Sequence, residues 1–216
     1  MKRAAIMIAV SFAIGACVGI AVYRWEKARA WALYAIGNIP YSEMREQLID
    51  AFSVPASIIV IGDSVSEYIN WHAALNRPDV VVHAFAGNTA ARASARAREA
   101  IGSGASTALV MLGINDIIAG YDPTPDYIRL IRALHAVDMR VVVSATVGDA
   151  KHKLATERLN TALQRECADD TCTFIDLTTL LAPNGVLAPQ YTIDGIHLNA
   201  SAYVIWVDAL RHRIDN

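Results

Sequence analysis

The chain has 216 residues, of which 54% are apolar, and its formal net charge is −2. This length accommodates one domain of ordinary size with an appended segment. The weak net charge gives no reason to expect nucleic acid as a partner, and three cysteines are too few for a disulfide scaffold.

An uncharged apolar segment covers residues 4–22, directly after Lys2 and Arg3. At a rise of about 1.5 Å per residue, a helix of this length just crosses the hydrocarbon core of a bilayer. We therefore expect residues 1–23 to form an uncleaved transmembrane signal-anchor helix. Two alternatives stay open, namely a cleaved secretory signal and a lipoprotein processed at Cys17.

Three small residues, Ser11, Gly15 and Gly19, recur every four positions within this segment. They would share one face of the helix, a pattern that lets a second membrane helix approach closely. The alternative is an anchor that is simply rich in alanine and glycine. Basic residues flank both ends of the segment, so charge does not decide its orientation. Residues 24–55 are expected to form interfacial and stalk helices.

Residues 56–216 alternate short apolar runs with longer helical patterns, which is typical of a parallel α/β sheet. The expected strands are residues 57–61, 80–84, 108–112, 140–144 and 172–175. The expected helices are residues 65–75, 89–101, 125–137, 154–168 and 200–211. Five parallel strands with right-handed crossovers predict a three-layer α/β/α sandwich.

Polar clusters follow three of the strands and precede the last helix. They are residues 62–64, 86–89, 113–116 and 194–199. The carboxyl ends of parallel strands meet at one edge of a sheet, and ligands bind there. We therefore expect these four clusters to converge on one site.

Each cluster supplies one role in acyl transfer. Ser64 is the candidate nucleophile, His197 the base that takes its proton, and Asp194 the carboxylate that orients the imidazole. The backbone N–H groups of Ser64 and Gly87 and the side-chain amide of Asn115 are candidate donors of an oxyanion hole. Taken alone, Ser64 could equally be a turn serine that caps the next helix.

In these four blocks the chain resembles the SGNH (GDSL-type) hydrolases. The blocks read Gly-Asp-Ser-Val-Ser from residue 62, Ala-Gly-Asn-Thr from 86, Leu-Gly-Ile-Asn-Asp from 112 and Asp-Gly-Ile-His-Leu-Asn from 194. The resemblance covers residues 56–212 and implies a flavodoxin-like sheet with the serine, glycine, asparagine, aspartate and histidine in the roles given above. The compact bacterial thioesterase/lysophospholipase-like branch is the most similar, both in size and in its Asp-Gly-Ile-His ending. The second block departs from the pattern, because His83-Ala84-Phe85 stands in place of the usual Asn-x-Gly opening before Gly87.

These features predict a membrane-anchored serine ester hydrolase, esterase-like or a carbohydrate O-acetylesterase, that needs no cofactor or metal. Its substrate would be a small-molecule, carbohydrate or lipid ester, and residues 183–191 would wall the acyl pocket. An O-acyltransferase would use the same residues, and a non-catalytic accessory subunit of a membrane complex is the rival class. The expected location is the bacterial inner membrane, with the catalytic domain in the periplasm.

Two smaller expectations concern cysteines and one acidic residue. Cys167 and Cys172 flank a short connection, and a disulfide across it is geometrically allowed and would suit the periplasm. Two unrelated reduced thiols are the alternative. Asp116 is expected to order its own loop, and a supporting role beside Ser64 is the alternative.

Overall fold

The computed structural model describes residues 41, 43–49, 51–52 and 55–214. The expected anchor, its small-residue face and most of the stalk lie outside these residues. Within the described part of the chain, no helix is both long and apolar enough to span a bilayer. The chain divides into two compact units, Met1–Arg45 and Glu46–Asn216. The second unit contains all five strands of the sheet.

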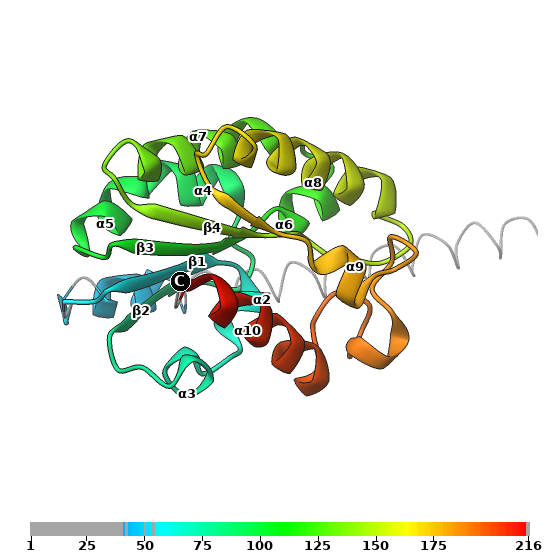
Figure 1. Ribbon diagram of the computed structural model, residues 1–216, viewed down its shortest axis with the longest axis horizontal. Helices are drawn as coiled ribbons and strands as arrows, with labels where there is room; N and C mark the ends of the chain where they lie inside the picture. The colour runs from blue at the N-terminus through cyan, green and yellow to red at the C-terminus, as the bar shows by residue number, and fades with distance from the viewer. Residues whose placement is uncertain (1–40, 42, 50, 53–54, 215–216) are drawn as a thin grey trace, which may run out of the picture. The chain divides into compact units, whose positions relative to one another are not determined.

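A five-stranded parallel sheet forms the centre of this unit, as the sequence predicts (Figure 1). Its strands are β1 (Ile58–Gly62), β2 (Val80–Ala84), β3 (Thr107–Met111), β4 (Arg140–Ser144) and β5 (Thr173–Ile175). They lie in the order β2-β1-β3-β4-β5. The chain thus leaves β1 toward one side and returns on the other, which makes the carboxyl ends of β1 and β3 the topological switch point where ligands bind.

Helices cover both faces of the sheet and complete the three layers (Figure 1). One face carries α3 (Trp71–Leu75), α9 (Leu177–Leu181) and α10 (Ala200–Ile214). The other carries α4 (Ala90–Ala95), α5 (Ala97–Gly102), α7 (Thr124–His135) and α8 (Lys153–Cys167). Two short helices, α2 (Ser64–Glu67) and α6 (Ile114–Ile118), begin at the carboxyl edge of the sheet.

Two buried tryptophans fill the core on the α10 face. The rings of Trp71 and Trp206 meet edge to face, with centroids 5.3 Å apart. Trp206 donates its indole N–H to Ser144 Oγ at 2.8 Å, and Trp71 donates to the Ser66 carbonyl at 2.7 Å. Both rings therefore bury their apolar surface without leaving a polar group unpaired.

The helix boundaries differ from expectation at polar residues inside apolar patterns. The expected helix at residues 65–75 is two helices. Asn70 is the N-cap of the second one, because its side chain accepts the Ala73 N–H at 3.2 Å. The expected helix at residues 89–101 breaks at Arg96. Two further helices, α6 and α9, were not predicted, because each is only five residues long and too short to show a helical period.

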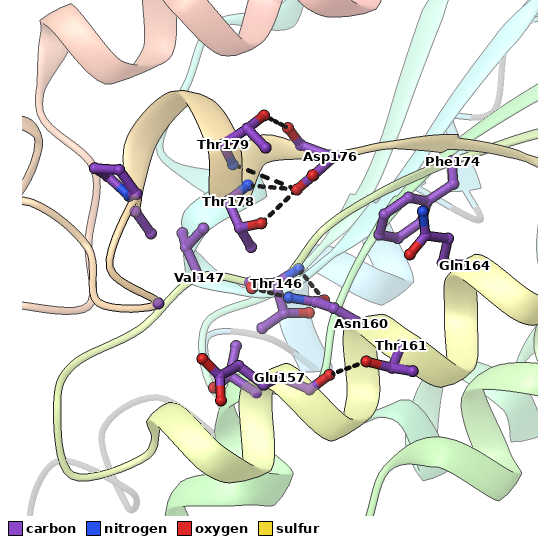
Figure 2. A pocket seen from close by; sticks show the side chains of 14 residues that line it. Thr146, Val147, Glu157, Asn160, Thr161, Gln164, Phe174, Asp176, Thr178 and Thr179 are labelled. Carbon is purple, nitrogen blue, oxygen red and sulfur yellow. Dashed lines mark hydrogen bonds between the residues drawn. The ribbon is translucent and has the colours of Figure 1, made fainter.

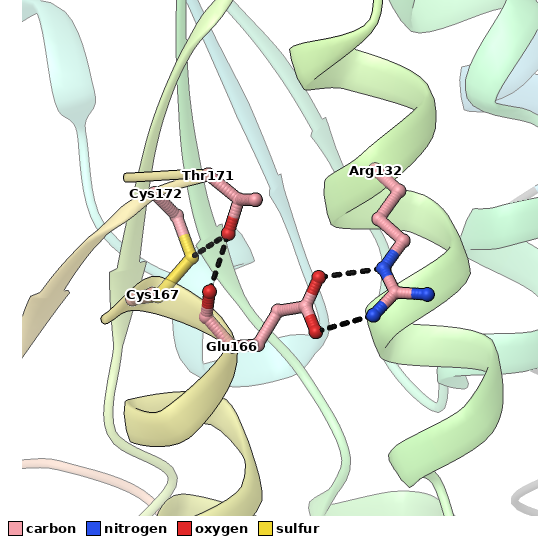
Figure 3. Close-up of a disulfide and its surroundings, with 5 residues drawn as sticks. All are labelled: Arg132, Glu166, Cys167, Thr171 and Cys172. Carbon is pink, nitrogen blue, oxygen red and sulfur yellow. Dashed lines mark hydrogen bonds and ion pairs between the residues drawn. A yellow bond between two sulfur atoms is a disulfide. The ribbon is translucent and has the colours of Figure 1, made fainter. Parts of the chain in front are cut away.

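Cys167 and Cys172 are joined by a disulfide across the turn between α8 and β5 (Figure 3). Beside it, the guanidinium of Arg132 on α7 makes two hydrogen bonds to the carboxylate of Glu166 on α8, at 2.6 and 2.8 Å. The Thr171 hydroxyl donates to the Glu166 carbonyl at 2.6 Å. The end of α8 is thus fixed both covalently and by the neighbouring helix.

Candidate active site

Ser64 is the first residue of α2 and is held directly beyond the end of β1. The carboxylate of Asp63 caps this helix by accepting the Val65 N–H at 3.0 Å. Gly62 lets the turn close tightly, because a Cβ atom there would lie 2.2 Å from Ser66 Oγ. The side chain of Ser64 is almost fully buried. The position of Ser64, the candidate nucleophile, is therefore fixed by the sheet and the core beneath it.

His197, from the last of the four blocks, contacts Ser64 although the two residues are far apart in the sequence. His197 Nε2 lies 3.0 Å from Ser64 Oγ, and its Nδ1 lies 2.7 Å from Asp194 Oδ2. Asp194 Oδ1 also accepts the backbone N–H of His197 at 2.8 Å and that of Ile196 at 3.0 Å. The structure thus brings the three expected residues into the serine–histidine–aspartate order that acyl transfer requires.

The carboxyl group of Asp194 is kept ionised by its hydrogen bonds. Partial burial would raise its pKa, but the N–H groups of His197 and Ile196 and the ring of His197 outweigh that effect. The pKa of Asp194 is therefore below its ordinary value. A carboxylate at this place favours a proton on the Nδ1 atom of His197 and leaves Nε2 free to accept the proton of Ser64.

A small hydrogen-bonded loop, residues 192–198, carries Asp194 and His197. Thr192 donates its hydroxyl to the His197 carbonyl at 2.8 Å and accepts the Gly195 N–H at 2.8 Å. The Ile193 N–H donates to the same carbonyl at 3.0 Å. At the base of the loop, Asn199 donates its amide to the Gln190 carbonyl at 2.7 Å. The loop is thus braced mainly by its own polar groups.

The second and third blocks, which carry the candidate oxyanion-hole donors Gly87 and Asn115, are joined by hydrogen bonds. Asn115 donates one amide hydrogen to the Asn88 carbonyl at 2.9 Å, and Asn88 donates to the Gly62 carbonyl at 3.0 Å. An asparagine amide has two hydrogens, so the bond to Asn88 orients the group and leaves one hydrogen for a ligand. Sequence reasoning did not single out Asn88, although it directly follows the glycine of the second block.

The backbone around Gly87 presents one unused donor. The Ala86 N–H donates to Glu67 Oε2 at 2.7 Å and the Asn88 N–H to the Phe85 carbonyl at 2.9 Å. Among the described residues, the Gly87 N–H has no acceptor. The φ angle of Gly87 is +75°, which only glycine adopts readily. The unusual second block therefore still offers the expected glycine N–H.

Two buried carboxyl groups complete the frame of the site. The Oδ2 atom of Asp116 accepts the Ala90 N–H at 3.1 Å and so ties α6 to the start of α4, a contact beyond its own loop. Asp63, the residue before Ser64, is almost fully buried, and burial raises its pKa to about 7. The contact of Asp116 with Ala90 has no signal in the sequence, because it joins segments that follow two different strands.

A polar pocket of about 310 Å³ lies beyond the ends of β4 and β5, between α8 and α9. Its lining includes none of Ser64, His197 and Asn115. Asn160 binds both backbone groups of Thr146, at 2.9 and 2.8 Å, and Thr178 binds Asp176 (Figure 2). The polar side chains of Asn160, Thr178 and Asp176 therefore already have hydrogen-bond partners within the protein. Pro183 and Gly185, expected to wall an acyl site, line this pocket instead.

Within the described ranges, no cluster of three or more histidine, cysteine, aspartate or glutamate side chains is arranged to hold a metal ion. The donors around Ser64 are N–H groups, which suit a developing negative charge on oxygen.

Comparison with known proteins identifies the sequence pattern. The sequence model of the GDSL-like lipase/acylhydrolase family matches residues 59–205, which include all four blocks. No curated protein matches the chain.

Solved structures share the fold at low sequence identity. A GDSL-like lipase from Bacteroides thetaiotaomicron is 17% identical, with a TM-score of 0.69 over 81% of this chain and 97% of that one. An acetylxylan esterase from Geobacillus stearothermophilus is 14% identical, with a TM-score of 0.61 over 76% and 97%. A psychrotrophic esterase from a Pseudoalteromonas species is 13% identical, with a TM-score of 0.58 over 73% and 96%.

Proposed function

The chain belongs to the GDSL-like lipase/acylhydrolase family and is an ester-hydrolysing serine hydrolase, and we propose that it works through Ser64, His197 and Asp194 by way of an acyl-enzyme. The contacts of His197 with both partners, at 3.0 and 2.7 Å, are the observation that carries this proposal. They join residues 133 positions apart in one proton-transfer chain.

In the first half-reaction, Ser64 Oγ attacks the ester carbonyl carbon while His197 Nε2 takes the hydroxyl proton. The carbonyl oxygen becomes an oxyanion, which accepts hydrogen bonds from the N–H groups of Ser64 and Gly87 and from the Asn115 amide. The C–O bond to the alcohol then breaks, and His197 gives the proton to the departing oxygen. The product is an acyl ester of Ser64.

In the second half-reaction, a water molecule replaces the alcohol. His197 takes a proton from the water, whose oxygen attacks the acyl carbon of the Ser64 ester. The tetrahedral intermediate uses the same three donors. The bond to Ser64 Oγ breaks, the serine regains a proton from His197, and the free acid leaves.

A serine-directed fluorophosphonate probe tests this assignment. Wild-type protein is expected to be labelled on Ser64, and the Ser64→Ala variant is expected to remain unlabelled while folding normally. Labelling should be followed by intact mass and by peptide mapping. Folded wild-type protein that stays unlabelled would favour the non-catalytic accessory subunit and sink the proposal.

We further propose that the domain is anchored by residues 1–23 and faces the periplasm. The apolar segment at residues 4–22 supports an anchor, and the disulfide between Cys167 and Cys172 supports an oxidising compartment. Alkaline phosphatase fused after Asn216 should be active and should sediment with the membrane fraction. If the phosphatase fusion is inactive and a cytoplasmic fluorescent reporter fused at the same site is fluorescent, the domain lies in the cytoplasm and the proposed orientation is wrong.

A further inference from the structure

A shallow apolar groove of about 440 Å³ runs between α3 and α10. Ile69, Ala73 and Ala74 line one side, and Tyr203, Val204 and Val207 are among the residues of the other. Its charged lining residues are Asp208 and Arg211, near the far end of α10. A continuous apolar groove on a protein surface often marks a binding site for an apolar ligand.

The near end of this groove adjoins the catalytic residues. The Tyr203 hydroxyl donates to the carbonyl of Val65, the residue after Ser64, at 2.7 Å. Ile69 follows Tyr68, whose ring centroid lies 5.4 Å from that of His197. The lining of the groove does not include Ser64 or His197, but two of its residues, Tyr203 and Ile69, lie within one hydrogen bond or one residue of Val65 and Tyr68.

Exposed apolar side chains continue this surface around the histidine. Tyr68 is 58% exposed, Val204 is 70% exposed, and Ile193, next to Asp194, is 77% exposed. Exposed residues of this kind near a reacting group are well placed to desolvate an apolar substrate. The polar pocket at β4 and β5 offers no comparable surface.

The length of the groove also suits a chain. From Tyr203 to Arg211, α10 advances by about 12 Å. The helix runs from the edge of the sheet that holds Ser64 to the opposite edge, where Arg140 at the start of β4 donates to the Arg213 carbonyl. Arg211 donates to the Ala74 carbonyl and closes the groove at that end.

We propose that the groove between α3 and α10 is the acyl-chain subsite, so that the enzyme prefers esters of medium-length fatty acids to acetate esters. This proposal rests on the proposed function of Ser64, His197 and Asp194. Each methylene removed from water would raise kcat/KM up to about fourfold. The acyl chain lies along α10 while the alcohol part leaves toward solvent.

The test measures kcat/KM for p-nitrophenyl acetate, butyrate, hexanoate and octanoate below their aggregation limits. The ratio of octanoate to acetate is expected to exceed about ten in the wild type. Val204→Asp and Ala73→Glu place a charge on opposite walls, and each should lower this ratio about tenfold or more, because a carboxylate beside a buried chain is poorly solvated. Taking the ratio removes effects on the acyl-transfer step itself.

Val137→Asp is the matched control, since Val137 is also an exposed valine but follows α7, outside the groove. Its ratio should stay within about twofold of wild type. Measurable acetate turnover with a flat chain-length profile would overturn the groove and leave the hydrolase intact. A steep profile that neither groove variant changes would also overturn it. Absence of turnover with every ester, together with no fluorophosphonate labelling, would overturn both proposals.

Discussion

Ser64 and His197, the proposed nucleophile and its proposed base, are held in place by opposite means. Ser64 is 4% exposed and lies on a turn that the sheet and its core support from beneath. Asp194 and His197 lie on the loop at residues 192–198, where the side chain of Asp194 is 52% exposed. That loop is organised by hydrogen bonds among its own residues.

Because of this difference, we expect substitutions near Ser64 to affect mainly stability and substitutions in the loop at residues 192–198 to affect mainly activity. Changes beneath Ser64 disturb packing that the whole domain shares, so they should be detected first as a lower free energy of unfolding. Changes in the loop at residues 192–198 break local bonds that water can partly replace, so they should leave folding nearly intact and affect the rate. Four substitutions test this division, from the largest expected effect to the smallest.

Asp194→Asn should lower kcat by about 10⁴-fold. The asparagine would offer an N–H to His197 Nδ1 where a carboxylate now accepts a proton, and so would favour the wrong tautomer of the ring. Because the loop is exposed, the melting temperature should change little. Stopped-flow or steady-state hydrolysis and a thermal melt of the same sample check both statements. A melting temperature that falls as far as that of Gly62→Ala at the same pH would contradict the division.

Asp63→Asn should change how stability depends on pH. Burial raises the pKa of Asp63 from 3.8 to about 7, so the folded state binds this proton more tightly than the unfolded chain. Stability of the wild type relative to the variant should therefore fall as pH rises from about 4 to 7, by up to about 4 kcal/mol. Asparagine still caps α2, so the cap itself is preserved. Urea titrations of both proteins across this range give the difference.

The same experiment on Asp194→Asn should give the opposite sign. The pKa of Asp194 is lowered, so this carboxylate stabilises the folded state above its unfolded pKa and loses that effect as pH falls through the folded pKa. Wild-type stability relative to Asp194→Asn should therefore rise with pH in the acid range. Equal signs for the two variants would show that the two carboxyl groups do not differ as described.

Gly62→Ala should destabilise the domain by about 1–3 kcal/mol. The new Cβ atom would lie 2.2 Å from Ser66 Oγ, 2.4 Å from Ser66 Cβ and 3.1 Å from the Met111 carbonyl oxygen, so neighbouring atoms would have to move. Gly102→Ala is the control, because a Cβ atom there meets no atom within 4 Å and alanine favours the helix. Chemical denaturation of both variants compares them. A Gly62→Ala protein as stable as Gly102→Ala would mean that the turn before Ser64 is not tightly packed.

The sequence revealed the parts of the fold that depend on local pattern. The strands β2 and β4 have the expected bounds, because continuous β-branched runs define them, and β1 and β3 are shifted by one residue. The break at Asn70 was missed because a side-chain cap inside an apolar pattern does not alter the period. For the site, the four blocks placed Ser64 beside His197 in the expected way.

The supporting contacts of the site could not be predicted in this way. Asp116 reaches Ala90, and Glu67 accepts the Ala86 N–H, across the gap between different strands. Such bonds depend on the distance between the ends of neighbouring strands, which cannot be predicted from the sequence pattern. The groove at Tyr203 and Val204 was missed for the same reason, since an exposed valine on a helix is ordinary until the facing helix is known.

Thr192→Val should have the smallest effect and is the most selective test of the loop at residues 192–198. Valine keeps the shape of threonine but neither donates to the His197 carbonyl nor accepts the Gly195 N–H. The cost in unfolding free energy should be about 1 kcal/mol or less, because both groups can bind water. A His197 ring displaced from Ser64 should lower kcat about tenfold with KM nearly unchanged. Thr161→Val, which removes an exposed hydroxyl bond to the Glu157 carbonyl within α8, is the matched control and should leave kcat unaltered.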